Sequence, residues 1–179
     1  MRLVINIHLQ DIVLIDEDQN IKLHFPVSTA ARGVGETQGS YCTPRGEHII
    51  RAKIGAGLPL NSVFVRRRPT GEIYSPELGL EYPGRDWILT RILWLSGKET
   101  GFNRGYTRDS KREENRASES AEESSVSCDT MRRYIYIHGT PDEHFKQQPE
   151  SHGCIRMRNA DILTLFDLVP VYTPVTIAT

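Results

Sequence analysis

The sequence predicts a mainly β protein, folded as a sandwich or barrel, with one clear helix after a cysteine-bearing loop. Two observations support this prediction. Apolar side chains recur at every second position along several short segments, as at Leu3, Ile5 and Ile7, and this period is typical of strands that bury one face. Segments that contain Gly and Pro separate these runs, and their spacing favours mostly antiparallel pairing.

The same pattern gives the order of the elements. Strands are predicted over residues 3–9, 21–28, 47–54, 62–66, 88–95, 133–138 and 171–177, with a turn at 68–71. The helix is predicted to begin with Asn159 as its N-cap and to end before Pro170. Because it starts five residues after Cys154, we expect it to support the loop that carries this cysteine.

Length and charge limit what the chain can do. Its 179 residues fit a single domain, residues 1–179. Lys and Arg total 22 against 23 Asp and Glu, so the net charge of −1 gives no field that would hold nucleic acid. The segment at about 104–129 contains no Leu, Ile, Phe, Trp or Met. With so little apolar surface to offset the entropy of ordering, it is predicted to be a charged, disordered insertion.

The N-terminal segment and the cysteines bear on the compartment. The first residues lack the unbroken apolar run and the small-residue cleavage site of a secretory signal peptide, and no segment is long enough to span a bilayer. We therefore expect a cytoplasmic protein, or a periplasmic one if the chain was trimmed. Three cysteines are too few for a disulfide framework. Only Cys154 lies in a motif, so Cys42 and Cys128 are interpreted as ordinary thiols.

A Ser-His-Gly-Cys motif at residues 151–154 follows an Ile-His-Gly motif at residues 137–139. An unperturbed thiol is mostly protonated at pH 7, so Cys154 needs a base to act as a nucleophile, and His138 is the candidate. The glycine before the cysteine allows a tight turn, so the N–H groups of Gly153 and Cys154 are expected to point at a developing oxyanion. The order, histidine first, argues against a papain-like arrangement.

These residues resemble the signature of the L,D-transpeptidases, also called YkuD-type domains. The match includes Ile-Arg after the cysteine and the nearby Asn159, and it extends to Thr-Pro-Arg-Gly at residues 43–46 and Ile-Leu-Trp-Leu at residues 92–95. It covers essentially the whole chain except the charged insertion. The resemblance implies a β-rich catalytic domain that acts on peptidoglycan stem peptides or muropeptides, with a cysteine that attacks the third stem residue and releases the terminal D-Ala.

The resemblance also implies roles for individual residues. It makes Cys154 the nucleophile, His138 the base and Gly139 the residue whose carbonyl holds the imidazole. The substrate-binding or oxyanion residues are Ser151, His152, Gly153 and Arg156. A loop-stabilising hydrogen bond stays open for His152. For Arg156 two roles stay open: its planar fork holds a carboxylate of the stem peptide, or it forms a structural ion pair with Asp161 or a neighbouring acid. No metal and no cofactor is expected.

Two further expectations concern side chains near these motifs. Strand alternation puts His138 on the face of Tyr134 and Tyr136, and so away from the core. The arginines at 66–68 and 132–133 are predicted to be solvated or edge-strand charges, which an anionic sugar-peptide could still use.

The resemblance leaves the acceptor of the acyl group open. Water gives an L,D-carboxypeptidase, which suits cytoplasmic muropeptide recycling, whereas an amine from another stem gives an exported transpeptidase that forms 3-3 cross-links. Two other classes remain as alternatives. His138, His144, His152 and Cys154 are suitable zinc ligands, although their spacing lacks short pairs. A non-catalytic cell-wall-binding module would have little use for the histidine–cysteine pair.

Overall fold

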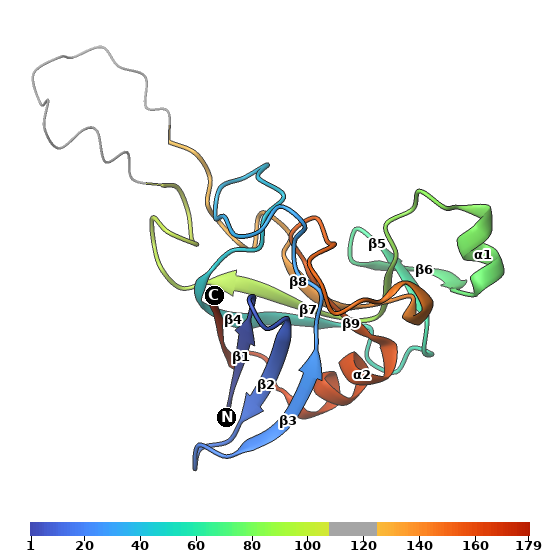
Figure 1. Ribbon diagram of the computed structural model, residues 1–179, viewed down its shortest axis with the longest axis horizontal. Coiled ribbons are helices and arrows are strands. Elements are labelled where there is room, and N and C mark those ends of the chain that lie inside the picture. The colour runs from blue at the N-terminus through green and yellow to red at the C-terminus, as the bar shows by residue number, and fades with distance from the viewer. Residues whose placement is uncertain (108–124) are drawn as a thin grey trace, which may run out of the picture.

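The computed structural model describes residues 1–107 and 125–179 (Figure 1). Residues 108–124, the centre of the predicted disordered insertion, lie outside the described residues. The described flanks of the insertion are joined by hydrogen bonds, since Thr107 N–H donates to Val126 O and Cys128 N–H to Gly105 O, both at 2.9 Å. Cys128 is fully buried. At the C-terminal end of the predicted insertion, this thiol packs as a small apolar group.

The described strands form one ten-stranded sheet that curls into a half-barrel, which confirms the predicted mainly β fold with one main helix. In chain order the elements are β1 (Arg2–Asn6), β2 (Asp11–Ile15), β3 (Ile21–Pro26), β4 (Gly46–Ile54), β5 (Ser62–Val65), β6 (Arg68–Ile73), α1 (Pro76–Glu81), β7 (Ile88–Gly97), β8 (Tyr136–Thr140), a 3-10 turn (Asp142–His144), β9 (Ile155–Arg158), α2 (Asn159–Leu168) and β10 (Pro174–Ala178). The strand order is β3-β2-β1-β10-β4-β7-β5-β6, with β8 and β9 branching from β7.

Most neighbouring strands are antiparallel, as predicted, but two described pairs are parallel. β1 runs parallel to β10, and β8 runs parallel to β9 with His138 opposite Arg156. The sequence pattern missed β9, because four residues are too few for a period of two to be recognised. This short strand brings the two sequence motifs onto adjacent strands.

Turns with positive φ angles set strand boundaries that the sequence pattern misplaced. The predicted strand at 3–9 ends at Asn6, because Gln10 has a φ of 54° and turns the chain into β2. The turn predicted at 68–71 is part of β6 instead. Arg66 and Arg67 form the turn, with φ angles of 49° and 67°.

Two more elements differ from the prediction. The strand predicted at 133–138 begins at Tyr136, because Tyr134 has a φ of 60° and lies in the turn before it. Helix α1 was not predicted, although its signal is present in the sequence. Ser75 caps it by accepting a hydrogen bond from Leu78 N–H, and proline follows at the first helical position.

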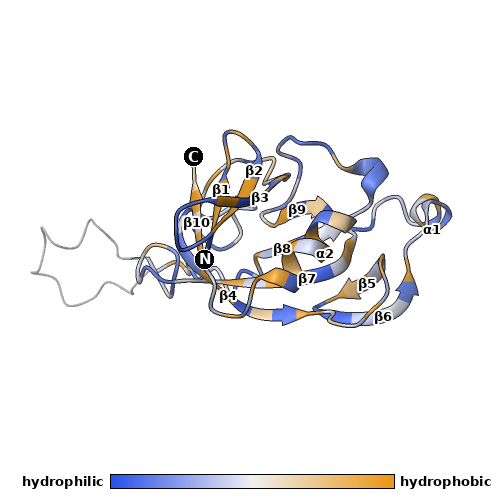
Figure 2. Cartoon of the chain, turned by 90° about the horizontal axis from the view of Figure 1, so that it is seen from below, coloured by the Kyte–Doolittle hydropathy of each residue, from blue (hydrophilic) through white to orange (hydrophobic). Residues whose placement is uncertain are grey.

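The main core joins one face of the sheet to helix α2, which buries Ile162, Leu165 and Phe166. Figure 2 shows the hydrophobic segments of β7, β8 and α2 gathered in the interior. A second apolar cluster lies on the other face of β7 and β8, where Phe64, Ile92 and Tyr136 pack together and Trp94 and Cys154 pack against them. The candidate cysteine therefore belongs to the smaller cluster.

Helix α2 begins at Asn159, but Asn159 is not its N-cap. Arg158 occupies that position without a side-chain cap, and the Asp142 carboxylate accepts the Asn159 N–H at 3.0 Å. The Asn159 side chain turns inward instead. Its amide donates to Thr140 O at 2.7 Å and its carbonyl oxygen accepts from Thr90 Oγ1 at 2.5 Å. This one side chain joins β7, β8 and α2.

Replacing Asn159 tests this junction. Asn159→Ala leaves the buried Thr140 carbonyl and Thr90 hydroxyl without these partners, so the free energy of unfolding should fall by about 2–4 kcal/mol. Urea unfolding followed by circular dichroism measures it. Thr164→Ala is the matched control on the exposed side of the same helix and should change stability by less than about 0.5 kcal/mol. Equal losses in the two variants would contradict the structural role of Asn159.

Candidate active site

The loop that carries Cys154 is held by its own hydrogen bonds. Ser151 Oγ donates to Cys154 O at 2.5 Å and accepts the Gly153 N–H at 3.2 Å. Ser151 is buried, and its hydroxyl shapes the loop through these two hydrogen bonds. Two N–H groups were expected to point at the oxyanion, those of Gly153 and Cys154. The Gly153 N–H already donates to Ser151 Oγ. The Cys154 N–H has no acceptor among the described residues.

Gly153 fits this loop because it has no side chain. Its φ is +127°, a region that other residues rarely adopt. An added Cβ would lie 3.1 Å from Ile135 Cδ1 and 3.3 Å from Cys42 O. The backbone of the loop at residue 42 therefore passes directly beside the candidate nucleophile's loop.

Two side chains fix that neighbouring loop. Thr43 Oγ1 donates to Gly153 O at 3.1 Å and accepts the Ala30 N–H at 3.0 Å. Arg133 donates to Gly35 O at 3.0 Å and to Cys42 O at 2.7 Å. The prediction of a solvated or edge-strand charge is wrong for Arg133, because its guanidinium donates to these backbone carbonyls. The sequence did not indicate that Arg133 would bind the backbone of a distant loop, because a charged residue before a strand is usually exposed.

His138 lies on β8 and is 1% exposed. Its position opposite the main core agrees with strand alternation, since Ile137 belongs to the main core and Tyr136 to the smaller cluster. His138 is nevertheless buried, because the smaller cluster covers this second face of the strand. His138 Nδ1 lies 2.8 Å from Gly139 O, which is the contact that the family resemblance implies.

Cys154 contacts the strand that carries His138. The half-buried Sγ donates to Tyr134 O and accepts the Tyr136 N–H, both at 3.4 Å. Among the described contacts, no hydrogen bond joins Sγ to the His138 imidazole. Both side chains line one cavity of about 180 Å³.

Burial sets the protonation of this pair. Loss of hydration raises the pKa of the Cys154 thiol to about 12, against the opposing effect of the Tyr136 N–H. Loss of hydration also lowers the pKa of His138 to about 4. At pH 7 the thiol is therefore protonated and the imidazole is neutral. A neutral imidazole is the form that can accept a proton.

Arg156 and Asp86 form an ion pair in the same cavity. Arg156 Nη2 lies 2.8 Å from Asp86 Oδ1. The acid that pairs with Arg156 is therefore Asp86 and not Asp161. Asp86 follows a Pro-Gly turn between α1 and β7 and has no motif around it, so the sequence did not indicate it.

His152 and Arg67 complete the surroundings of the cysteine. His152 is exposed and packs edge-on against Tyr41 at a ring distance of 6.2 Å. Arg67 lies over the rings of Trp94 and Tyr134, at 4.6 and 4.5 Å from their centroids, and donates to Tyr136 Oη at 3.0 Å. The prediction of a solvated Arg67 is wrong, because the β5–β6 turn places it on the aromatic wall.

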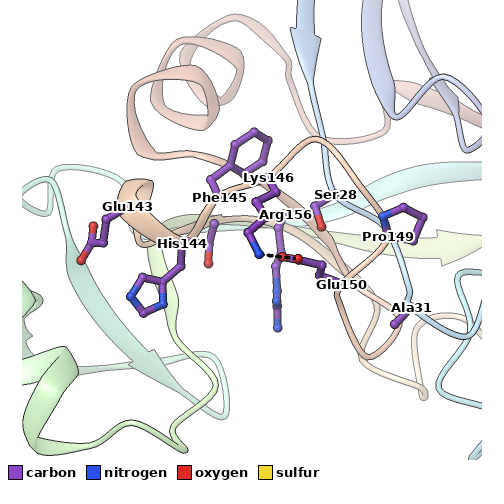
Figure 3. Close-up of a pocket in the computed structure, with 10 residues that line it drawn as sticks. Ser28, Ala31, Glu143, His144, Phe145, Lys146, Pro149, Glu150 and Arg156 are labelled. Carbon is purple, nitrogen blue, oxygen red and sulfur yellow. Dashed lines mark hydrogen bonds and ion pairs between the residues drawn. The ribbon is translucent and has the colours of Figure 1, made fainter.

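A larger depression of about 640 Å³ adjoins the cavity (Figure 3). Lys146 and Glu150 form an ion pair of 3.1 Å on its wall, and Arg156 lies beside them. Arg156 lines both spaces.

The residues considered as zinc ligands do not lie together. His144 lines the larger depression, whereas His138, His152 and Cys154 line the smaller cavity. In the described part of the chain, no three His, Cys, Asp or Glu side chains are arranged to hold a metal ion. Each described helix is too short or too polar to cross a membrane.

The fold and the cavity define a curled β-sheet domain in which a half-buried cysteine and a buried histidine line one site. Comparison with protein families gives the particular class. The YkuD model, the L,D-transpeptidase catalytic domain, matches residues 1–177, so this chain belongs to that family. No curated protein matches the chain.

Several solved structures are similar. A Bdellovibrio bacteriovorus protein has a TM-score of 0.50 and 13% identity, and the match covers 98% of this chain and 46% of that one. An L,D-transpeptidase from Xylanimonas cellulosilytica has a TM-score of 0.49 and 16% identity, with 98% and 58% covered. One from Mycobacterium smegmatis has a TM-score of 0.49 and 14% identity, with 99% and 58% covered. The chain spans less than two thirds of each, and at such identities likeness concerns the fold alone.

The tight loop predicts a cost for any side chain at residue 153. Gly153→Ala should lower the free energy of unfolding by about 2–3 kcal/mol, because the φ of +127° is strained for alanine and the Cβ crowds two neighbours. Gly33→Ala is the matched control, since φ is +78° there and nothing lies within 4 Å of an added Cβ. It should cost about 1 kcal/mol. Urea unfolding that gave the control the larger loss would contradict the packing described for the loop.

The protonation state predicts an unusual pH dependence of alkylation. Because the pKa of Cys154 is raised to about 12, its thiolate fraction grows tenfold per pH unit through pH 10. Peptide mass spectrometry after brief iodoacetamide treatment should therefore show a Cys154 rate that still rises at pH 10. In the urea-unfolded chain the same cysteine should level off above about pH 8.5–9. A plateau near pH 8 in the folded protein would mean that burial does not control the thiol.

Proposed function

We propose that this domain is a cysteine acyltransferase that acts on peptidoglycan tetrapeptide stems and releases the terminal D-Ala. The single observation that carries the proposal is the cavity shared by Cys154 and His138, with the imidazole fixed by Gly139 O. Membership of the L,D-transpeptidase family supports the class of reaction. The Bdellovibrio structure adds only the fold.

The first half of the reaction forms an acyl-enzyme. His138 Nδ1 carries its proton and donates to Gly139 O, so Nε2 keeps the lone pair that accepts the Cys154 proton. Sγ attacks the carbonyl of the third stem residue, and the Cys154 N–H faces the developing oxyanion. Collapse of the tetrahedral intermediate breaks the peptide bond. The imidazolium returns its proton to the nitrogen of the departing D-Ala.

The second half removes the acyl group. Neutral His138 takes a proton from the incoming acceptor, which attacks the thioester carbonyl. When the acceptor is water, the products are a tripeptide carboxylate and the free thiol, which recovers its proton from the imidazolium. When it is an amine, the product is a new amide bond.

We propose that water is the main acceptor, which makes the protein an L,D-carboxypeptidase of cytoplasmic muropeptide recycling. The cytoplasm contains no polymeric wall, so a thioester on Cys154 meets few acceptor amines there. The second candidate is an exported transpeptidase that forms 3-3 cross-links, which the family membership favours equally. Fractionation of the native producer separates the two locations. Soluble tetrapeptide muropeptides should accumulate in a deletion strain if recycling is the role, and 3-3 cross-links should decrease if cross-linking is.

One mutational experiment tests the chemistry. The purified protein is incubated with a disaccharide-tetrapeptide, and the products are read by mass spectrometry. Wild type should release D-Ala and accumulate tripeptide without dimers, Cys154→Ala should give none, and His138→Ala should lose about 10²–10⁴-fold in rate.

Two control variants replace a cysteine and a histidine outside the shared cavity, to show that a loss of activity does not follow from replacing any residue of these types. Cys42→Ala removes a thiol outside the shared cavity, and His24→Ala removes an exposed histidine that pairs with Asp11. Both should keep at least about half the wild-type rate, as surface changes usually do. Full activity in Cys154→Ala would reject the acyl-enzyme, and dimeric products would favour transpeptidation.

A further inference from the structure

Arg156 has an unusual place among the charged residues of the site. It lies opposite His138 across the β8–β9 pair, two residues after Cys154, and it lines both the cysteine cavity and the larger depression. The other arginine of the cavity, Arg133, is engaged with backbone carbonyls. Arg156 is therefore the guanidinium in this cavity that is available to a charged ligand.

The ion pair with Asp86 uses Arg156 incompletely. Only Nη2 of the guanidinium contacts the Asp86 carboxylate, at 2.8 Å, while the buried Nε has no partner among the described residues. Arginine binds a carboxylate best through two parallel hydrogen bonds. In the present contact, Nη2 binds a carboxylate oxygen, but Nε, the second donor of such a two-bond contact, has no partner among the described residues.

Asp86 is placed so that it can be displaced. The exposed fraction of its side chain is 53%, against 19% for Arg156. It lies in the segment between α1 and β7, and its carboxylate makes no other hydrogen bond to a described residue. An exposed, one-point ion pair contributes little to stability. A carboxylate that forms two bonds to the same guanidinium can therefore replace it.

We propose that Arg156 receives the free carboxylate of the residue that leaves the substrate, and that Asp86 competes with it for the same guanidinium. The inference rests on the proposed function for the identity of the peptide. In a tetrapeptide the terminal carboxylate lies one residue beyond the carbonyl that Cys154 attacks, which matches two groups lining one small cavity. Binding exchanges one carboxylate for another on Arg156. Asp86 thereby selects ligands that offer a full carboxylate over those that end in an amide.

Binding measurements test this exchange without requiring turnover. In the Cys154→Ala background, calorimetry compares a tetrapeptide that ends in a free carboxylate with the same peptide ending in an amide. Adding Asp86→Ala should tighten binding of the acid about three- to tenfold and leave the amide unchanged. Adding Arg156→Gln should weaken binding of the acid about tenfold or more, with the amide changed less than about twofold.

Two further variants make the result specific. With Arg156→Gln present, Asp86→Ala should have no further effect on the acid, because the competitor then has nothing to compete for. Asp86→Asn, which keeps the volume, should act in the same direction as Asp86→Ala. Asp16→Asn is the control, since it breaks a surface ion pair with Lys22 at the β2–β3 turn and should alter neither peptide.

The outcomes separate this inference from the proposed function. Acid and amide that bind equally, or that shift together in the Asp86 and Arg156 variants, overturn the inference, as does failure to bind either peptide. Hydrolysis by wild-type protein in that case leaves the proposed function standing. The predicted binding pattern without any hydrolysis supports the carboxylate exchange and rejects the proposed reaction.

Discussion

The arrangement of the site depends on the absence of a side chain at Gly139. A Cβ there would collide with Asn159 Oδ1 and lie 2.8 Å from Leu89 O, so only glycine lets β8 pack between β7 and the start of α2. In that position the Gly139 carbonyl lies 2.8 Å from His138 Nδ1. The orientation of the imidazole thus comes from backbone packing, where many hydrolases use an acidic side chain. The same contact favours the tautomer that carries its proton on Nδ1 and leaves Nε2 free to accept one.

Burial gives this pair a different starting point from a thiolate–imidazolium pair. The same loss of hydration that raises the thiol pKa lowers the imidazole pKa, so both groups favour their neutral forms. Transfer of the proton before attack would create two charges in a poorly hydrated cavity. Transfer concerted with formation of the C–S bond avoids the free thiolate, because the negative charge develops on the carbonyl oxygen. In the proposed reaction, the imidazole therefore takes the thiol proton as the C–S bond forms, and the backbone N–H of Cys154 is the donor expected to stabilise the carbonyl oxygen.

The sequence predicted the features that local chemistry controls. Period-two alternation identified β1, β3, β4, β5 and β7, and the two residues that the motifs single out, His138 and Cys154, line one cavity. It failed where long-range contacts decide. The four residues of β9 form a strand because β8 lies beside them, and no local pattern records that. Asn159 has the residue type of an N-cap, yet the buried partners Thr90 and Thr140 turn its side chain inward.

The arginines show most clearly why residue type alone does not give a role. Arg67, Arg133 and Arg156 all surround the cysteine, but each meets a different partner: aromatic rings, backbone carbonyls and a carboxylate. A guanidinium over rings or bonded to carbonyls keeps its charge and holds a wall of the cavity in place. One paired with a partly exposed carboxylate can exchange its partner. The first two arginines therefore shape the cavity, and only the third is in a position to distinguish one charged ligand from another.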